Sequence, residues 1–176
     1  MKADSALLKN GKPFFIPDFS SEIHHEIEVV VRINKLGKYI AARFASRYYE
    51  DVTVGIDFTA RDLQRQLRAE GMPWEISKSF DNSAAIGTFV PLSEAGGKVD
   101  RLDFHLLKNG TLVQQGNTEQ MIFNVNEIIA YASRFFTLKI GDLIFTGTPA
   151  GVGTVAINDH LEGFLGQQKL LDFYVR

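Results

Sequence analysis

The sequence predicts an α+β fold that is mainly β, with several short strands and two short helices. Three observations carry this prediction: apolar runs that alternate with polar residues, a tight-turn signal between two such runs, and two stretches with helical spacing. Strands and helices do not alternate along the chain, so a βαβ architecture is not expected. A chain of 176 residues with 45% hydrophobic residues can bury a core, and we expect one domain over residues 1–176.

The first clear strand begins at Glu26, in the sequence Glu-Ile-Glu-Val-Val-Val-Arg-Ile. Side chains alternate along a strand, so one face would carry the core residues Ile27, Val29, Val31 and Ile33. The opposite face would carry Glu26 and Glu28 and would look toward a cavity or solvent. Further strands are expected at residues 52–58, 143–146 and 170–175.

Local turn and capping signals place the other elements. Residues 102–107 and 112–115 flank Asn109-Gly110, a dipeptide typical of a two-residue β-hairpin. One helix is expected over residues 59–68, where Thr59 would cap the helix with Asp62 three residues later. A second helix would begin at Asn124, with Glu127 completing a capping box. The turn-rich stretch 91–100 is expected to be a surface loop.

Composition excludes several classes of partner and site. The net charge of −2 comes without a basic cluster, so nucleic acid is not an expected partner. No apolar run approaches the roughly 20 residues that span a bilayer, and no signal peptide is visible, so we expect a cytoplasmic protein without a membrane partner. Since the sequence contains no cysteine, any metal must be held by oxygen or imidazole ligands.

Three carboxylates are candidate metal ligands. Glu26 and Glu28 share a strand face, with Cα atoms about 6.5 to 7 Å apart, although a lone Glu-x-Glu is more often a solvated strand face. Asp57 lies in the apolar context Val-Gly-Ile-Asp-Phe, where it either caps the following helix or binds a cation. Three oxygen ligands would suit Mg²⁺ or Mn²⁺.

Other polar residues near these motifs have two readings each. Lys78 is either a solvated surface lysine or a group that stabilises the negative charge of an enolate. The loop 147–153 lacks the Lys-Ser/Thr of a P-loop and is more typical of a turn whose N–H groups and Thr148 hydroxyl hold a small carboxylate. His24 and His25 point to opposite sides of a strand and are interpreted as supporting residues.

Four blocks together resemble the fumarylacetoacetate hydrolase family. In order, they are His24-His-Glu-Ile-Glu28, Gly55-Ile-Asp-Phe-Thr-Ala-Arg-Asp-Leu-Gln64, Pro73-Trp-Glu-Ile-Ser-Lys-Ser-Phe80 and Gly141-Asp-Leu-Ile-Phe-Thr-Gly-Thr-Pro-Ala-Gly-Val-Gly153. The resemblance runs from about Lys2 to the C-terminus. It implies a mixed β-sandwich roll of the type found in the family's C-terminal domain, usually as a homodimer.

The resemblance also implies roles for individual residues. The metal would be Mg²⁺ or Mn²⁺, with Ca²⁺ as a further candidate, and the substrate a small 2-oxo or diketo acid. The implied metal ligands are Glu26, Glu28 and Asp57; the implied catalytic residues are Lys78 and Gln64; and the implied substrate-binding residues are Arg61 and Thr148. The first expectation is hydrolysis of a C–C bond in an acylpyruvate or fumarylpyruvate-type acid. The alternatives are a 2-hydroxyhepta-2,4-diene-1,7-dioate isomerase, an oxaloacetate decarboxylase or tautomerase, and an inactive remnant that binds metal and a diacid.

The sequence departs from the family pattern at its start. Family members carry, before the Glu-x-Glu, a Gly-x-Asn-Tyr-x-x-His-x-x-Glu segment whose His and Glu activate water on a mobile lid. The sequence instead begins with Met1-Lys-Ala-Asp-Ser5, which resembles the Lys-Pro-x-Ser that follows this lid. We therefore expect either a sequence from which the N-terminus has been lost or a shortened member, and isomerase or decarboxylase activity gains weight against hydrolysis.

Overall fold

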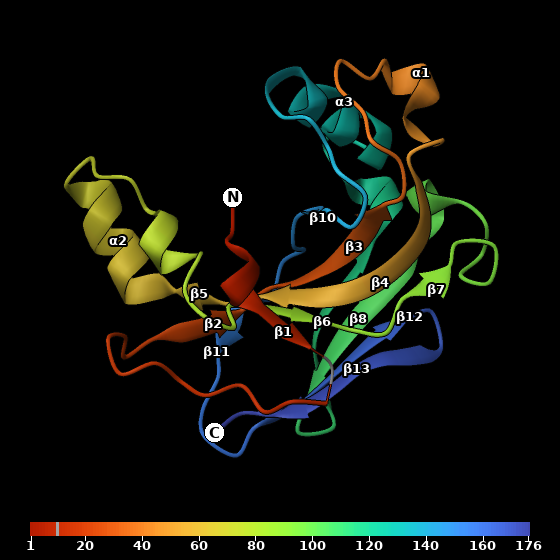
Figure 1. Ribbon diagram of the computed structural model, residues 1–176. Helices are drawn as coiled ribbons and strands as arrows, with labels where there is room; N and C mark the ends of the chain where they lie inside the picture. Colours follow the sequence, from red (N-terminus) through yellow and green to blue (C-terminus); the bar gives the residue numbers. More distant parts are fainter. Residues whose placement is uncertain (10) are drawn as a thin grey trace.

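The computed structural model describes residues 1–9 and 11–176, and within them the strands form three sheets (Figure 1). The largest sheet has the order β1 (Leu7–Lys9), β6 (Ala84–Ile86), β4 (Tyr49–Asp57), β3 (Ile27–Ile33) and β10 (Leu143–Phe145), with β7 (Val90–Pro91) paired to β4. The second has the order β13 (Gln168–Tyr174), β12 (His160–Leu165), β8 (Asp103–Lys108) and β9 (Thr111–Asn117). The small third sheet contains β11 (Gly153–Thr154), β2 (Ile23–His25) and β5 (Thr59–Ala60).

The helices lie in two separate regions of the structure. The α-helices are α1 (Ala42–Ala45), α2 (Arg61–Ala69) and α3 (Val125–Phe135), and short 3₁₀ helices span Asp4–Ala6, Glu75–Ser77, Val99–Arg101 and Thr118–Gln120. Figure 1 shows α1 and α3 side by side at one end, whereas α2 continues from β5 at the other. The predicted mainly β, α+β fold is confirmed, and α1 is a short helix beyond the two predicted. No helix of the described residues is long and apolar enough to cross a membrane.

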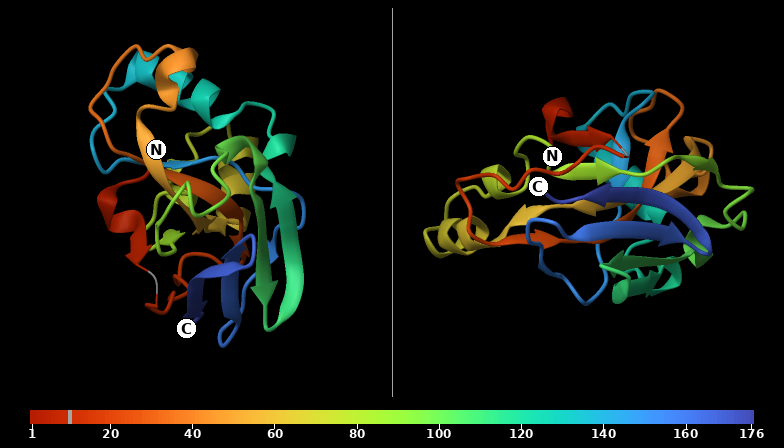
Figure 2. Two further views of the ribbon diagram at one scale, coloured as in Figure 1. Left: turned by 90° about the vertical axis from the view of Figure 1, so that its right-hand side faces the viewer. Right: turned by 90° about the horizontal axis from the view of Figure 1, so that it is seen from below.

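The two larger sheets pack against each other, as the turned views of Figure 2 show. The approach is close: a Cβ added to Gly163 of β12 would lie 3.0 Å from Val54 Cγ2 of β4. An aromatic stack extends this core, because the Phe14 and Phe58 rings lie 3.8 Å apart and Phe173 meets Phe58 edge-on. The core is therefore a layer between sheets, which agrees with the implied sandwich.

Strand β3 is covered on both faces, which the sequence pattern did not predict. All its residues except Arg32 are buried, including Glu28 and Val30 on the face expected to look toward a cavity or solvent. The cover comes from a distant part of the chain, since the loop after β10 donates the Gly147 N–H to the Glu28 carboxylate. Glu28 is consequently an acid in a protein interior.

Strong local signals gave correct predictions for the hairpin and for α3. Asn109 and Gly110 both have positive φ angles, of 54° and 76°, and join β8 to β9 as expected for a primed hairpin turn. Asn124 and Glu127 form the predicted capping box at the start of α3.

The predicted Thr59 cap of the other helix is wrong. Thr59 pairs with His24 of β2 in the third sheet, and α2 begins only at Arg61. Asp62 instead accepts hydrogen bonds from the Ser20 hydroxyl and from the Ser21 and Leu63 N–H groups. Burial works in the opposite direction, but these donors lower the pKa of Asp62 to about 2. Asp62 thus fastens the start of α2 to the segment before β2.

Candidate metal and substrate site

Backbone pairing brings the three predicted carboxylates together. Glu26 immediately precedes β3, Glu28 lies within it, and Asp57 ends the neighbouring antiparallel strand β4. The Asp57 N–H donates to the Glu26 carbonyl oxygen at 2.8 Å, which fixes the two residues side by side. One carboxylate oxygen from each of the three residues lies within 4.8 Å of the other two. Glu26 and Glu28 are only 7% and 5% exposed, so these acids lie in a poorly solvated place where ionisation is costly without a compensating charge.

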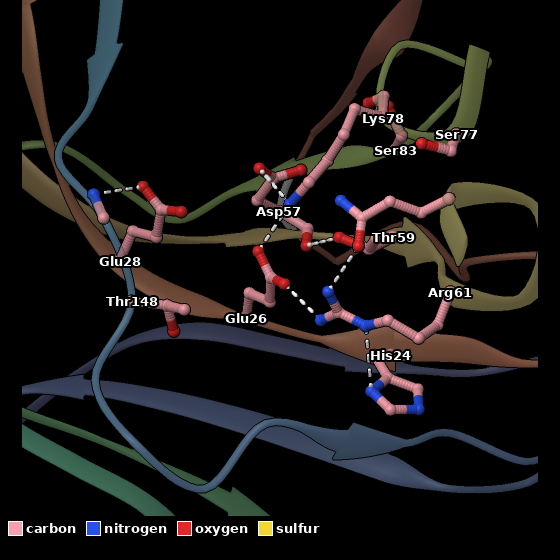
Figure 3. A network of polar contacts seen from close by, with 12 residues as sticks. His24, Glu26, Glu28, Asp57, Thr59, Arg61, Ser77, Lys78, Ser83 and Thr148 are labelled. Carbon is pink, nitrogen blue, oxygen red and sulfur yellow. Dashed lines mark hydrogen bonds and ion pairs between the residues drawn. The ribbon is translucent and has the colours of Figure 1, made fainter. Parts of the chain in front are cut away.

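Two cationic side chains, Lys78 and Arg61, hold Glu26 (Figure 3). Lys78 Nζ lies 2.5 Å from Glu26 Oε2 and 3.0 Å from Asp57 Oδ2, so one ammonium group bridges two of the acids. Arg61, at the start of α2, donates to the other Glu26 oxygen. Burial alone would raise the pKa of Glu26, but these two cations outweigh it and lower the pKa.

Glu28 has a different environment. Its Oε2 accepts the Gly147 N–H at 2.7 Å, and no cationic side chain of the described residues forms an ion pair with it. Burial, together with the negative charge of Asp57, raises the pKa of Glu28 to about 8. A positive charge bound between the acids would stabilise the ionised form of Glu28.

Lys2 is a site residue for which the sequence analysis assigned no role. Its Nζ lies 2.8 Å from Asp57 Oδ1 and donates to the Ser83 hydroxyl and to the Lys78 carbonyl oxygen. Burial lowers the pKa of Lys2, against the opposing effect of Asp57. Lys2 thus joins the N-terminal segment to the acidic cluster through an ion pair with Asp57.

These observations fit a hard divalent cation. The donor set consists of carboxylate oxygens alone, which suits Mg²⁺, Mn²⁺ or Ca²⁺. Glu28 is a buried acid without a cationic partner among the described residues. A bound cation would stabilise its ionised form.

Gln64, Arg61 and His24 form a second group beside the acids. Arg61 Nη1 donates to Gln64 Oε1 at 2.7 Å, and Arg61 Nε lies 3.4 Å from His24 Nδ1. Gln64 is buried on α2, and Arg61 holds its side-chain carbonyl by this hydrogen bond. In Figure 3 the Arg61 guanidinium lies between Glu26 and the His24 ring. This position agrees with the interpretation of His24 as a supporting residue.

Thr148 lies against the strand that carries the glutamates. Its hydroxyl donates to the Ile27 carbonyl oxygen at 2.8 Å and accepts from Gln114 Nε2 at 2.9 Å. Beside the Thr148 loop lies a cavity of about 410 Å³, which Phe104, Met121, Phe123 and Ile128 also line. All seven residues implied by the resemblance therefore lie in one connected region: Glu26, Glu28, Asp57, Arg61, Gln64, Lys78 and Thr148.

Residues 1–173 match the family model described as fumarylacetoacetate (FAA) hydrolase C-terminal. The chain belongs to the fumarylacetoacetate hydrolase family. Its similarity to the mitochondrial oxaloacetate tautomerase FAHD1 of Mus musculus is 39% identity over 162 residues, covering 92% of this chain and 73% of that protein. The oxaloacetate tautomerase YcgM of Escherichia coli K12 is 37% identical, over 92% of this chain and 74% of that protein.

Solved structures of family members agree with this fold. A fumarylpyruvate hydrolase from Pseudomonas aeruginosa, in complex with Mn²⁺ and pyruvate, superposes with a TM-score of 0.92 at 37% identity, covering 99% of this chain and 76% of that chain. A 2-hydroxyhepta-2,4-diene-1,7-dioate isomerase from Mycobacterium marinum superposes with a TM-score of 0.89 at 29% identity, over 99% of this chain and 66% of that one. The protein is thus an enzyme of this family, whose named members include hydrolases, isomerases and tautomerases.

Proposed function

We propose that this enzyme interconverts the keto and enol forms of small 2-oxo diacids of the oxaloacetate type, with a divalent cation held by Glu26, Glu28 and Asp57. The observation that supports it best is the cluster of three carboxylates, with the Lys78 ammonium against two of them. Tautomerisation moves one proton from C3 to the 2-oxo oxygen and needs no attacking water. The relatives named oxaloacetate tautomerases favour this reaction.

The cation would be Mg²⁺ or Mn²⁺, and when bound it would supply the positive charge that polarises the 2-oxo group. Lys78 would stabilise the negative charge that develops on the 2-oxo oxygen, since its ammonium group is already directed at the cluster. Arg61 would hold a substrate carboxylate through its planar guanidinium group. Thr148 would orient the substrate from the opposite loop.

A second candidate is hydrolysis of fumarylpyruvate-type acids. The Pseudomonas aeruginosa fumarylpyruvate hydrolase in complex with Mn²⁺ and pyruvate favours it. Gln64 would then hold the attacking water. Arg61 keeps the Gln64 amide beside the cluster by donating to its oxygen. Decarboxylation is a third outcome, which a relative in Dictyostelium discoideum named oxaloacetate decarboxylase supports at 40% identity over 151 residues.

Product analysis separates these reactions. The Mn²⁺-loaded protein is given oxaloacetate and, separately, fumarylpyruvate, while enol absorbance, pyruvate and CO₂ are measured. The proposal predicts a faster change in the enol absorbance of oxaloacetate without release of CO₂. Pyruvate from fumarylpyruvate would instead identify a hydrolase, CO₂ a decarboxylase, and no change with either acid an inactive diacid-binding protein.

The substitution Lys78→Met tests whether the protein accelerates the reaction beyond the rate that Mn²⁺ alone gives. The variant should bind Mn²⁺ but lose about 10²- to 10³-fold in rate, as expected for the loss of one preorganised donor to an oxyanion. Lys12→Met, at an exposed lysine, is the matched control and should keep the wild-type rate. An unchanged rate in Lys78→Met would exclude the role proposed for Lys78.

A further inference from the structure

Gln114 is a buried amide in β9 whose hydrogen-bonding groups are all used by the region around the site. It is 1% exposed. Its Oε1 accepts from Ile27 N–H at 3.0 Å and contacts His25 Nδ1 at 2.8 Å. Its Nε2 donates to Thr148 Oγ1 at 2.9 Å and to the Pro149 carbonyl oxygen at 3.1 Å. One side chain from the second sheet therefore joins strand β3 to the loop that carries Thr148.

The orientation of this amide follows from its partners. The Ile27 N–H can only donate and the Pro149 carbonyl can only accept, so oxygen and nitrogen cannot be exchanged. His25 Nδ1 must then carry a hydrogen that it donates to Gln114. Hence Gln114 also fixes the hydrogen-bonding state of the residue that precedes Glu26.

The same amide fixes the direction of the Thr148 hydroxyl. Because Gln114 donates to Thr148 Oγ1, the hydroxyl hydrogen is directed to the Ile27 carbonyl oxygen. The side chain then presents a remaining lone pair, and not its O–H, to other partners. Both backbone polar groups of Ile27, its N–H and its carbonyl oxygen, belong to this network, and Ile27 stands between Glu26 and Glu28.

We propose that Gln114 is a positioning residue for substrate binding, which sets the spacing between the Glu26–Glu28 segment and the Thr148 loop and fixes the direction of the Thr148 hydroxyl. The inference rests on the proposed function, because it assumes that Thr148 faces the substrate. The acids have supports of their own in Lys78, Arg61 and the Gly147 N–H. Loss of Gln114 should therefore weaken substrate binding more than cation binding.

The chain offers a matched control, because Gln115 is the next residue and is exposed. Mn²⁺ is titrated into the wild type, Gln114→Met and Gln115→Met by calorimetry, and oxalate is then titrated into each Mn²⁺-saturated protein. All titrations are made well below the unfolding midpoint of each protein. We expect Gln114→Met to lose about tenfold or more in oxalate affinity, with a much smaller change in Mn²⁺ affinity. Gln115→Met should match the wild type in both.

Gln114→Glu adds a pH-dependent readout of the hydrogen bonds to Thr148 and Pro149. A carboxylate at this position can still accept from Ile27 and His25, but it places oxygen against Thr148 Oγ1 and the Pro149 carbonyl. Only the protonated acid can donate to one of them. The oxalate affinity of Gln114→Glu at saturating Mn²⁺, compared with that of the wild type, should therefore recover as the pH is lowered. The oxalate affinity of Gln115→Glu should follow the wild-type pH profile.

The outcomes distinguish the two proposals. If the wild type fails to bind oxalate in the presence of Mn²⁺, the proposed function is wrong. If the wild type binds oxalate and folded Gln114→Met binds it equally well, or loses Mn²⁺ and oxalate affinity in equal proportion, the role of Gln114 is wrong. If Gln114→Met does not fold, the pH profile of Gln114→Glu decides, and a profile parallel to the wild type overturns the inference.

Discussion

The two glutamates of the cluster differ in how their charge is compensated. Glu26 has Lys78 and Arg61 as partners, whereas Glu28 is buried against a single backbone N–H. The pKa of Glu28 is raised to about 8, so below that pH the metal-free protein holds a proton there that a bound cation would displace. Cation binding and proton release should consequently be coupled at this one residue.

This coupling predicts a pH dependence with opposite signs for stability and affinity. The folded protein holds the Glu28 proton more tightly than the unfolded chain, whose pKa is near 4.5. The stability that this group contributes without metal is full below about pH 4.5 and is lost as the pH rises through about 8. Apparent Mn²⁺ affinity should rise roughly tenfold per pH unit up to about pH 8. Calorimetric titration at several pH values measures this affinity, with Glu28→Gln as the control. A Mn²⁺ affinity of the wild type that does not change with pH would contradict the coupling to Glu28.

Asp57 carries a second prediction, because it contacts both lysines of the cluster. Asp57→Asn keeps the size of the side chain but removes the charge, and Mn²⁺ affinity should fall about 100-fold or more while the fold persists. Asp18→Asn, at an exposed turn, should leave the affinity unchanged. Circular dichroism checks the fold, and calorimetry the affinity. Equal Mn²⁺ binding by Asp57→Asn and the wild type would remove Asp57 from the site.

The sequence indicated some site residues and not others for a physical reason. Glu26 and Glu28 follow from strand alternation, which is a local property. Lys2 and Gln114 reach the site through contacts with residues far away in the sequence, such as Lys2 with Asp57 and Gln114 with Ile27, so no periodicity reveals them. The resemblance of Met1–Ser5 to a family motif was the one available signal for Lys2.

At the level of elements, local signals succeeded where the stabilising contact is local. Asn109-Gly110 and the Asn124–Glu127 pair each act within a few residues, and both structures form as predicted. The prediction of a Thr59 cap was wrong because strand pairing with His24 of β2 overrides the capping tendency of this residue. The burial of both faces of β3 could not be predicted either, since residues far along the chain cover it.

Strand β4 offers a test of how closely the site elements pack. Gly55 pairs with Glu28, and a Cβ added there would lie 2.8 Å from the Ala85 carbonyl oxygen and 2.8 Å from Phe145 Cε1. Gly55→Ala should cost about 1 to 3 kcal/mol of stability and weaken Mn²⁺ binding, because the strand must shift beside Glu28.

The control for this substitution is Gly153→Ala in β11, where the added Cβ would be 3.4 Å from its nearest neighbour. Its cost should stay within about 0.5 kcal/mol. Urea denaturation measures both variants. Equal stability of the two would show that the strands around Glu28 adapt freely, contrary to the tight packing described.

At the scale of the whole molecule, the site lies where the sheets meet. The acids come from the largest sheet and the segment before it, Gln114 comes from the second sheet, and Arg61 follows the third. Figure 1 shows the N-terminal segment beside the end of β4, which brings Lys2 to Asp57. Assembly of the candidate site therefore depends on correct packing of all three sheets.

The homodimer implied by the resemblance and the cytoplasmic location expected from the composition stay predictions. Sedimentation equilibrium should give a mass of twice the 19.7 kDa of one chain. A mass equal to one chain at all protein concentrations would contradict the homodimer, without bearing on the metal site.

The most direct test of the central claim is thermal unfolding of the wild type in EDTA, in Mn²⁺, and in Mn²⁺ with oxalate, a mimic of a 2-oxo acid enolate. A ligand that binds only the native state raises the unfolding midpoint. We expect the unfolding midpoint to rise with Mn²⁺, to rise further with oxalate, and to be unaffected by oxalate in EDTA. A midpoint that neither Mn²⁺ nor oxalate changes would contradict the assignment of Glu26, Glu28 and Asp57 as a metal site.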